Sequence, residues 1–361
     1  MQPPSEPPRG FWSTHWLNTG AIVGATYTGV RLLPPALSHA IGRAGTYVAY
    51  RTMRETTAAL VDNLRAVRPG TPERALQALA LETFRSYARD TIEFMRHVGA
   101  TEAEVDRLIE TPSRPHVERV LSEGKGALML TGHFGSWELG GMLVRRFGWP
   151  LTVLTMPEAS PAVSEIRRRI RERLGVDTIE VRQSIDTALQ IRRRLADGHI
   201  VAMLVDRHVD KDRVEVTFCG RRAHFLRTPA LLSYFTGAPL VPCFITRQAN
   251  GRYLAYMEQP IALDRASPRD EAVRDATQRF ATLLEERLRA TPSYWYQFYR
   301  YWDAQREATT DSSRDRPSPA RMSGRLAAGA SQVEPEPASP EAAGQADGQP
   351  TTALREPSTT A

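Results

Sequence analysis

The pattern of apolar residues changes at Gly126, and this change limits the folds open to the chain. Before it, apolar residues recur at helical spacing through about 120 residues. After it, short apolar runs alternate with amphipathic segments. The runs predict strands over 127–131, 151–156, 178–181, 199–206, 214–218, 240–246 and 253–257, and helices over 138–147, 163–174, 185–196, 229–235 and 270–290. This order predicts an α/β fold, with helices flanking a sheet and a helical N-terminal region.

The N-terminal part divides into a short tail and a helical layer. Residues 1–10 are Pro-rich and we expect them to be disordered, whereas 11–120 read as helices that break at Pro34-Pro35 and Pro69-Gly70. Trp12 and Trp16, with arginines at the margins, suit attachment to a membrane surface, although a helical pair packed on the main domain fits equally. We find no apolar run of about 18 residues and no signal-peptide pattern, so we expect no transmembrane helix.

The C-terminal tail differs in composition from the folded part. Residues 304–361 contain no Phe, Trp or Tyr and are rich in Ala, Pro, Ser and Thr, which predicts disorder and leaves 121–303 as the α/β core. The chain has a formal net charge of +6, and the tail, with 6 Arg and 8 acidic residues, leaves +8 on residues 1–303. This excess favours lipid headgroups, an acidic carrier protein or nucleic acid as partner, or is only an arginine-rich surface.

A histidine follows the first predicted strand directly. The strand over 127–131 ends at Thr131-Gly132, and His133 and Glu138 come next, around the small residues Gly135 and Ser136. Histidine is the natural general base near neutral pH, and a carboxylate that accepts its Nδ1–H fixes the tautomer. We therefore predict His133 as base and Glu138 as its partner at the carboxyl edge of a sheet. The two cysteines, Cys219 and Cys243, have no spacing typical of a metal site or a disulfide framework, which fits a cytosolic protein.

The segment from Gly132 to Glu138 resembles the signature of the late bacterial lipid A biosynthesis acyltransferases, within the lysophospholipid acyltransferase-like superfamily. The similarity continues in Asn63-Leu64-Arg65, in Val205-Asp206-Arg207, in the segments 216–223, 228–230 and 236–242, and in the aromatic segment 294–298. It implies a glycerolipid-acyltransferase-like mixed sheet. Cys219 and Thr228 depart from the family's pattern, where Phe and Gly are usual.

The resemblance also implies the chemistry. An acyl thioester, on acyl carrier protein or coenzyme A, would donate its chain to a hydroxyl of a lipid A precursor, and no other cofactor or metal is implied. Substrate contacts would come from Arg171, Arg168, Asp206, Arg207 and Gly135, with Arg171 as the best positional match for the family's arginine. Amides near Gly132–Gly135, or Arg171, would stabilise the oxyanion.

Three alternatives stay open at this point. The acceptor could be a phosphatidylinositol mannoside or a lysophospholipid, or the chain could be a non-catalytic protein that binds anionic membranes. The N-terminal transmembrane anchor usual in this family is missing in its clear form, so we expect a peripheral or shallowly inserted enzyme at the cytoplasmic face of the inner membrane, without a nucleic-acid partner.

Overall fold

The computed structural model describes residues 20–156, 160–181, 185–208 and 212–304. The disorder expected for 1–10 and for the C-terminal tail therefore lies outside the described residues. The helices are α2 (Gly20–Leu32), α3 (Pro35–Thr52), α4 (Arg54–Val67), α5 (Glu73–His97), α6 (Glu102–Leu108), α7 (Arg114–Leu121), α8 (Trp137–Arg146), α9 (Pro161–Leu174), α10 (Ile185–Ala196), α11 (Thr228–Thr236), α12 (Arg269–Ala290) and the 3-10 turn η2 (Pro292–Tyr294). The strands are β1 (Ile109–Glu110), β2 (Ala127–Thr131), β3 (Leu151–Thr155), β4 (Asp177–Glu180), β5 (Ile200–Leu204), β6 (Val214–Phe218), β7 (Arg221–Phe225), β8 (Leu240–Arg247) and β9 (Tyr253–Met257).

The main sheet is mixed, with the order β1-β9-β8-β2-β5-β3-β4. Its pairs are parallel except β8 with β9, which run antiparallel. The strands β6 and β7 form a separate antiparallel hairpin. The predicted α/β class, with a mixed sheet and a helical N-terminal region, is confirmed.

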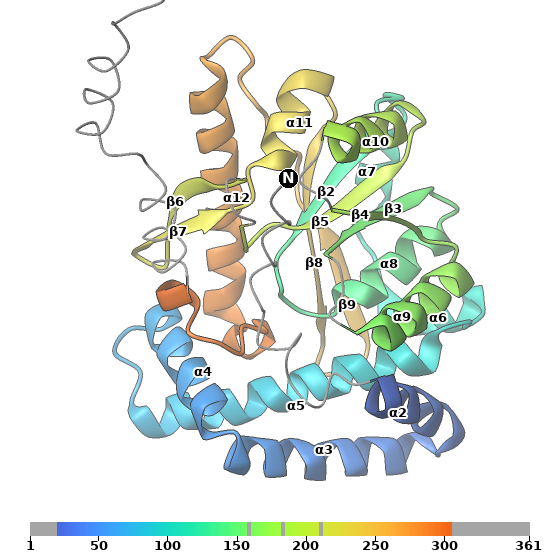
Figure 1. Cartoon of the computed structure of the whole chain (residues 1–361), viewed down its shortest axis with the longest axis vertical. Helices are drawn as coiled ribbons and strands as arrows, with labels where there is room; N and C mark the ends of the chain where they lie inside the picture. Colours follow the sequence, from blue (N-terminus) through green and yellow to red (C-terminus); the bar gives the residue numbers. More distant parts are fainter. Residues whose placement is uncertain (1–19, 157–159, 182–184, 209–211, 305–361) are drawn as a thin grey trace, which may run out of the picture. The chain divides into compact units, whose positions relative to one another are not determined.

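Both faces of the sheet are covered by helices (Figure 1). Along β2 the side chains alternate, because successive residues of a strand point to opposite faces. Leu128 and Leu130 pack into the core that α10, α11 and α12 share with α4 and α5. Ala127 and Met129 face the other way, toward a core built from α7 and α8. The fully apolar run of the sequence is therefore a strand buried on both sides.

The predicted helix and strand ends agree with the structure within about two residues, the usual uncertainty of such boundaries. Two strands were missed. β1 is only 2 residues long, and β7 contains Arg221, Arg222 and His224, whose polar side chains hid the strand pattern. Both N-terminal helix breaks are where the prolines predict them, since α3 begins at Pro35 and α4 ends at Val67.

The N-terminal helices lie beyond the ends of the strands, below the sheet in the view of Figure 1. α5 runs beneath these strand ends, and α3 packs on the far side of α5. None of the helices in the described part of the chain is both long enough and apolar enough to cross a membrane.

Candidate active site

Two neighbouring strands bring His133 and Asp206 together. β2 and β5 pair in parallel with Thr131 opposite Leu204. His133 and Asp206 each lie two residues beyond these positions, so both side chains emerge at the same level of the carboxyl edge. The Nδ1 atom of His133 lies 2.7 Å from Oδ1 of Asp206, and the backbone N–H of His133 donates to Oδ2 at 3.0 Å. The pair thus links residues that are 73 positions apart in the chain.

Asp206 is a buried, ionised carboxylate. Its side chain is fully buried and accepts further hydrogen bonds from Trp295 Nε1 (3.1 Å) and Gln297 Nε2 (2.9 Å). Burial alone would raise the pKa of Asp206, but His133, Arg207 and Trp295 outweigh it and hold the pKa at about 2. A carboxylate in this state accepts hydrogen bonds only, so the proton of His133 must be on Nδ1. The lone pair of neutral His133 is therefore on Nε2.

His133 is set up to be neutral near pH 7. Its side chain is 16% exposed, and burial lowers its pKa below the usual value of 6.5, with a further lowering from the charge of Arg207. Asp206 opposes this shift without reversing it. The ring of Trp137 meets the ring of His133 edge-on, with centroids 5.6 Å apart. A neutral imidazole with an unprotonated Nε2 is the form that a general base requires.

The C-terminal aromatic segment holds Asp206 in place. In addition to Trp295 and Gln297, Tyr301 donates from its hydroxyl to the backbone carbonyl of Asp206 at 2.7 Å. Asn63 of α4 holds this segment through its side-chain amide, which donates to the carbonyls of Gln297 (3.0 Å) and Tyr299 (2.7 Å). Asn63 and the aromatic segment both belong to the family resemblance, but nothing in the sequence indicates that they meet.

Glu138 is not the hydrogen-bond partner of His133 that we predicted from the sequence. Asp206, not Glu138, accepts the Nδ1 hydrogen bond of His133. Glu138 lies in the first turn of α8 and is exposed to solvent, although protein surrounds its carboxyl group. Desolvation raises its pKa to about 7, although its own backbone N–H, Arg167 and Arg171 favour the charged form. The pKa shifts of Glu138 and Asp206 are therefore opposite in direction, and only Asp206 contacts His133.

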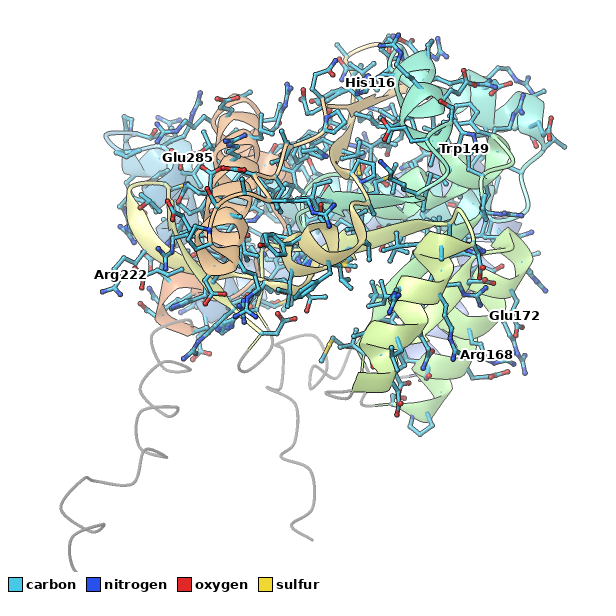
Figure 2. All side chains as sticks on the ribbon, turned by 90° about the horizontal axis from the view of Figure 1, so that it is seen from above. His116, Trp149, Arg168, Glu172, Arg222 and Glu285 are labelled. Atoms are coloured by element: carbon cyan, nitrogen blue, oxygen red, sulfur yellow. The ribbon has the colours of Figure 1, made fainter. Side chains whose placement is uncertain are left out.

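The predicted arginines separate into two groups. Arg171 lies on α9 and, with Arg167, acts electrostatically on Glu138. Arg207 donates from Nε and Nη2 to the side-chain oxygen of Gln297 (3.0 and 2.7 Å) and stacks 5.1 Å above the ring of Tyr299. Arg168, in contrast, is half exposed and pairs with Glu165 and Glu172 of its own helix. It lies on an outer surface of the molecule (Figure 2), so the structure does not bring it to His133.

Gly135 has a structural reason to be glycine. Its φ is +67°, and an added Cβ would lie 1.9 Å from the carbonyl oxygen of Ile245 in β8. Its N–H donates to Tyr294 O at 2.9 Å. The amides of His133 and Gly135 therefore already have acceptors, which leaves other amides near Gly132–Gly135 and Arg171 as the predicted stabilisers of an oxyanion.

Other nucleophiles and metal ligands are poorly placed. Ser136 is 1% exposed. Burial raises the pKa of the thiols of Cys219 and Cys243 to about 12, so both are protonated at neutral pH. Within the described residues, no three His, Cys, Asp or Glu side chains are grouped to hold a metal ion. His133 remains the side chain best suited to catalysis.

The α/β sheet holds a histidine–carboxylate pair at its carboxyl edge, an arrangement suited to general-base catalysis. The family model described as bacterial lipid A biosynthesis acyltransferase matches residues 12–304, so the chain belongs to this family and is an acyltransferase. Its relatives include the phosphatidylinositol mannoside acyltransferase of Mycobacterium tuberculosis (strain CDC 1551 / Oshkosh), which is 28% identical over 287 residues, 77% of this chain and 86% of the relative. The enzyme of the same name from Mycolicibacterium smegmatis is 25% identical, over 76% of this chain and 88% of the relative. The family resemblance predicted from the sequence is confirmed.

Proposed function

We propose that the protein transfers a fatty acyl chain from an acyl thioester to a hydroxyl of a phosphatidylinositol mannoside, with His133 as the general base. The observation that carries the chemistry is the hydrogen bond of 2.7 Å between His133 and the buried Asp206. The acceptor rests on the relatives, whose names specify this glycolipid. It was an alternative in the sequence analysis. A lipid A precursor, preferred there, is now the second candidate and is supported by the family description.

The reaction needs one base that later serves as an acid. Nε2 of His133 takes the proton of the acceptor hydroxyl as the oxygen attacks the thioester carbonyl. When the tetrahedral intermediate collapses, the C–S bond breaks and Nε2–H returns the proton to the leaving thiolate. Asp206 keeps the ring in the Nδ1–H tautomer throughout and stabilises the transient imidazolium.

Glu138 has a different role in this proposal from the one that the sequence suggested. With Nδ1 of His133 already bonded to Asp206, Glu138 is available to contact hydroxyls of the acceptor. Arg171 and Arg167 are the nearby cations, and Arg171 is the candidate for binding the phosphate of the acceptor or charge on the oxyanion. Gln297 holds Arg207 in place, and the positive charge of Arg207 lowers the pKa of His133.

The donor and the location follow from chemistry and charge. Acyl carrier protein and coenzyme A both present a thioester on an anionic carrier, which the net charge of +8 on residues 1–303 would attract. α3 exposes Leu37, Ile41 and Val48, which suits a peripheral position on the cytoplasmic face of the plasma membrane.

An assay with purified protein tests this proposal. Labelled acyl carrier protein or acyl-coenzyme A thioesters are offered with phosphatidylinositol mannoside, a lipid A precursor or a lysophospholipid, and the lipid products are analysed by mass spectrometry. We expect transfer to the mannoside, and a loss of about 10²–10⁴-fold in turnover for His133→Ala. Full turnover of a folded His133→Ala protein would refute the base, and transfer only to another lipid would refute the acceptor. His97→Ala, whose ring contacts Glu93 within α5, is the matched control.

A further inference from the structure

A cavity of about 540 Å³ lies between α3 and α5, and none of the residues of the candidate active site lines it. Its walls carry four arginines, which are Arg43, Arg85, Arg89 and Arg247. The lining residues also include His39, which pairs with Glu93 at 2.9 Å, and a single acidic side chain, Glu82. The volume is in the range of small-molecule sites.

The positive charges of this cavity are incompletely balanced. Glu82 is shared by Arg85 and Arg89 at 3.7 Å each, which is too long for a hydrogen bond. Arg43 and Arg247 form no salt bridge within the described part of the chain, although buried Asp90 acts electrostatically on Arg89 and Arg247. The Nε–H groups of Arg89 and Arg247 are buried and have no hydrogen-bond partner among the described residues. A bound anion would supply acceptors for these donors, and leaving a buried donor without a partner costs about 1–3 kcal/mol.

The chemistry of the lining selects the ligand. Arginine forks bind phosphate with paired N–H donors, and clustered guanidinium groups beside one carboxylate favour a compact anion. A cavity of this size admits a phosphate group with its neighbouring polyol, but not the surface of a folded protein.

The outer side of α3 indicates where such a ligand comes from. Leu37, Ile41, Ala44 and Val48 follow one another at intervals typical of a single helix face, and all four are exposed. The cavity-lining residues His39, Gly42 and Thr46 are on the opposite face, toward α5. If the apolar face enters a bilayer by about 5–10 Å, the opposite face, one helix diameter away, lies at the level of the lipid headgroups.

We propose that the cavity between α3 and α5 binds the phosphate headgroup of an anionic phospholipid while α3 lies on the membrane. This site is additional to the acceptor site at His133 and does not depend on the proposed acyl transfer. It would make membrane attachment selective for lipid, instead of a sum of diffuse charge attractions.

The test compares two double variants that lose equal charge. R43A/R85A removes two arginines from the cavity, whereas R51A/R54A removes two exposed arginines of the same region that do not line it. Diffuse attraction to an anionic surface predicts an equal loss for both, roughly fivefold per arginine. A headgroup site predicts that R43A/R85A loses at least about tenfold more affinity than R51A/R54A. Binding is measured by co-sedimentation with vesicles of phosphatidylcholine and phosphatidylglycerol in equal amounts, and with phosphatidylcholine alone.

Four further measurements decide the outcome. Thermal unfolding establishes that both variants fold, and the charge-preserving R43K/R85K should recover part of the binding. Equal losses for the two alanine variants would overturn the proposal. So would tight binding of inorganic phosphate that needs Arg43 and Arg85 while vesicle binding does not, since the ligand would then be a free anion. Loss of binding to acyl carrier protein with unchanged vesicle binding would also overturn it. The measurements use full-length protein carrying His133→Ala, so they are independent of acyl transfer.

Discussion

His133 and Asp206 form a partly buried hydrogen bond of 2.7 Å, although 73 residues separate them in the chain. The bond exists because β2 and β5 are neighbours in register, and each strand delivers its side chain two residues past its last pair. The same carboxylate accepts three other hydrogen bonds, from the backbone of His133, from Trp295 and from Gln297. The orientation of the base is therefore determined by the sheet and by the C-terminal segment together.

Asp206→Asn and Glu138→Gln should separate the roles of the two carboxyls. Asp206→Asn removes the charge that stabilises the imidazolium, so we expect kcat to fall by about 10²–10⁴-fold. Glu138→Gln leaves the His133 hydrogen bond intact, so we expect its main effect on KM for the acceptor, with kcat reduced less than about tenfold. Steady-state kinetics with the same donor decides this. The reverse ranking of the two kcat values would restore Glu138 as the partner of His133.

The sequence places His133 and Asp206 at the ends of two predicted strands, but it does not show that the two residues meet. Short apolar runs predict the strands at 127–131 and 199–206, and His133 and Asp206 come at or just after their ends. Both signals are local in the sequence. Whether β5 neighbours β2 depends on the strand order, which no local pattern encodes. Closeness in sequence favours Glu138 as the partner of His133, whereas the carboxylate that accepts from Nδ1 of His133 is Asp206.

The hydrogen bonds that hold the segment around Asp206 in place cannot be predicted from the sequence, for the same reason. Asn63 and Gln297 are 234 residues apart, and their hydrogen bond depends on how α4 packs against the end of the chain. The cavity arginines, likewise, come from α3, α5 and β8 and have no common motif. The apolar face of α3, in contrast, depends on local spacing only, so the sequence alone is sufficient to show it.

Asn63→Ala should weaken both the fold and the catalysis. Asn63 makes three hydrogen bonds to the backbone of residues 297–301 and is 2% exposed. Its loss leaves buried polar groups unpaired, so we expect a drop of about 2–4 kcal/mol in the free energy of unfolding. Because that segment also carries Gln297 and Tyr301, kcat should fall as well. Asn250→Ala, at an exposed turn where Oδ1 of Asn250 accepts from Arg252 N, is the control and should change neither quantity.

Gly135→Ala should destabilise the protein far more than Gly148→Ala. Both glycines have positive φ, +67° and +74°. Either substitution therefore carries the cost of a left-handed conformation, about 1–2 kcal/mol. Only Gly135 faces a backbone atom, at 1.9 Å from an added Cβ, whereas Gly148 faces open space. We expect an additional loss of at least about 2 kcal/mol for Gly135→Ala in urea unfolding. Equal effects of the two variants would mean that β8 can move away from the catalytic segment.

The pH dependence of kcat/KM should report the environment of His133. Burial and Arg207 lower the pKa of His133, so the active, neutral form persists below the usual value of 6.5 and the acidic limb should have its midpoint below that pH. Arg207→Gln removes a positive charge that disfavours the imidazolium. The pKa of His133 should then rise, and the acidic limb should move to higher pH. Arg269→Gln, on the exposed start of α12, should leave the profile unchanged. A limb that stays in place in Arg207→Gln, or moves to lower pH, would show that another group controls the rate.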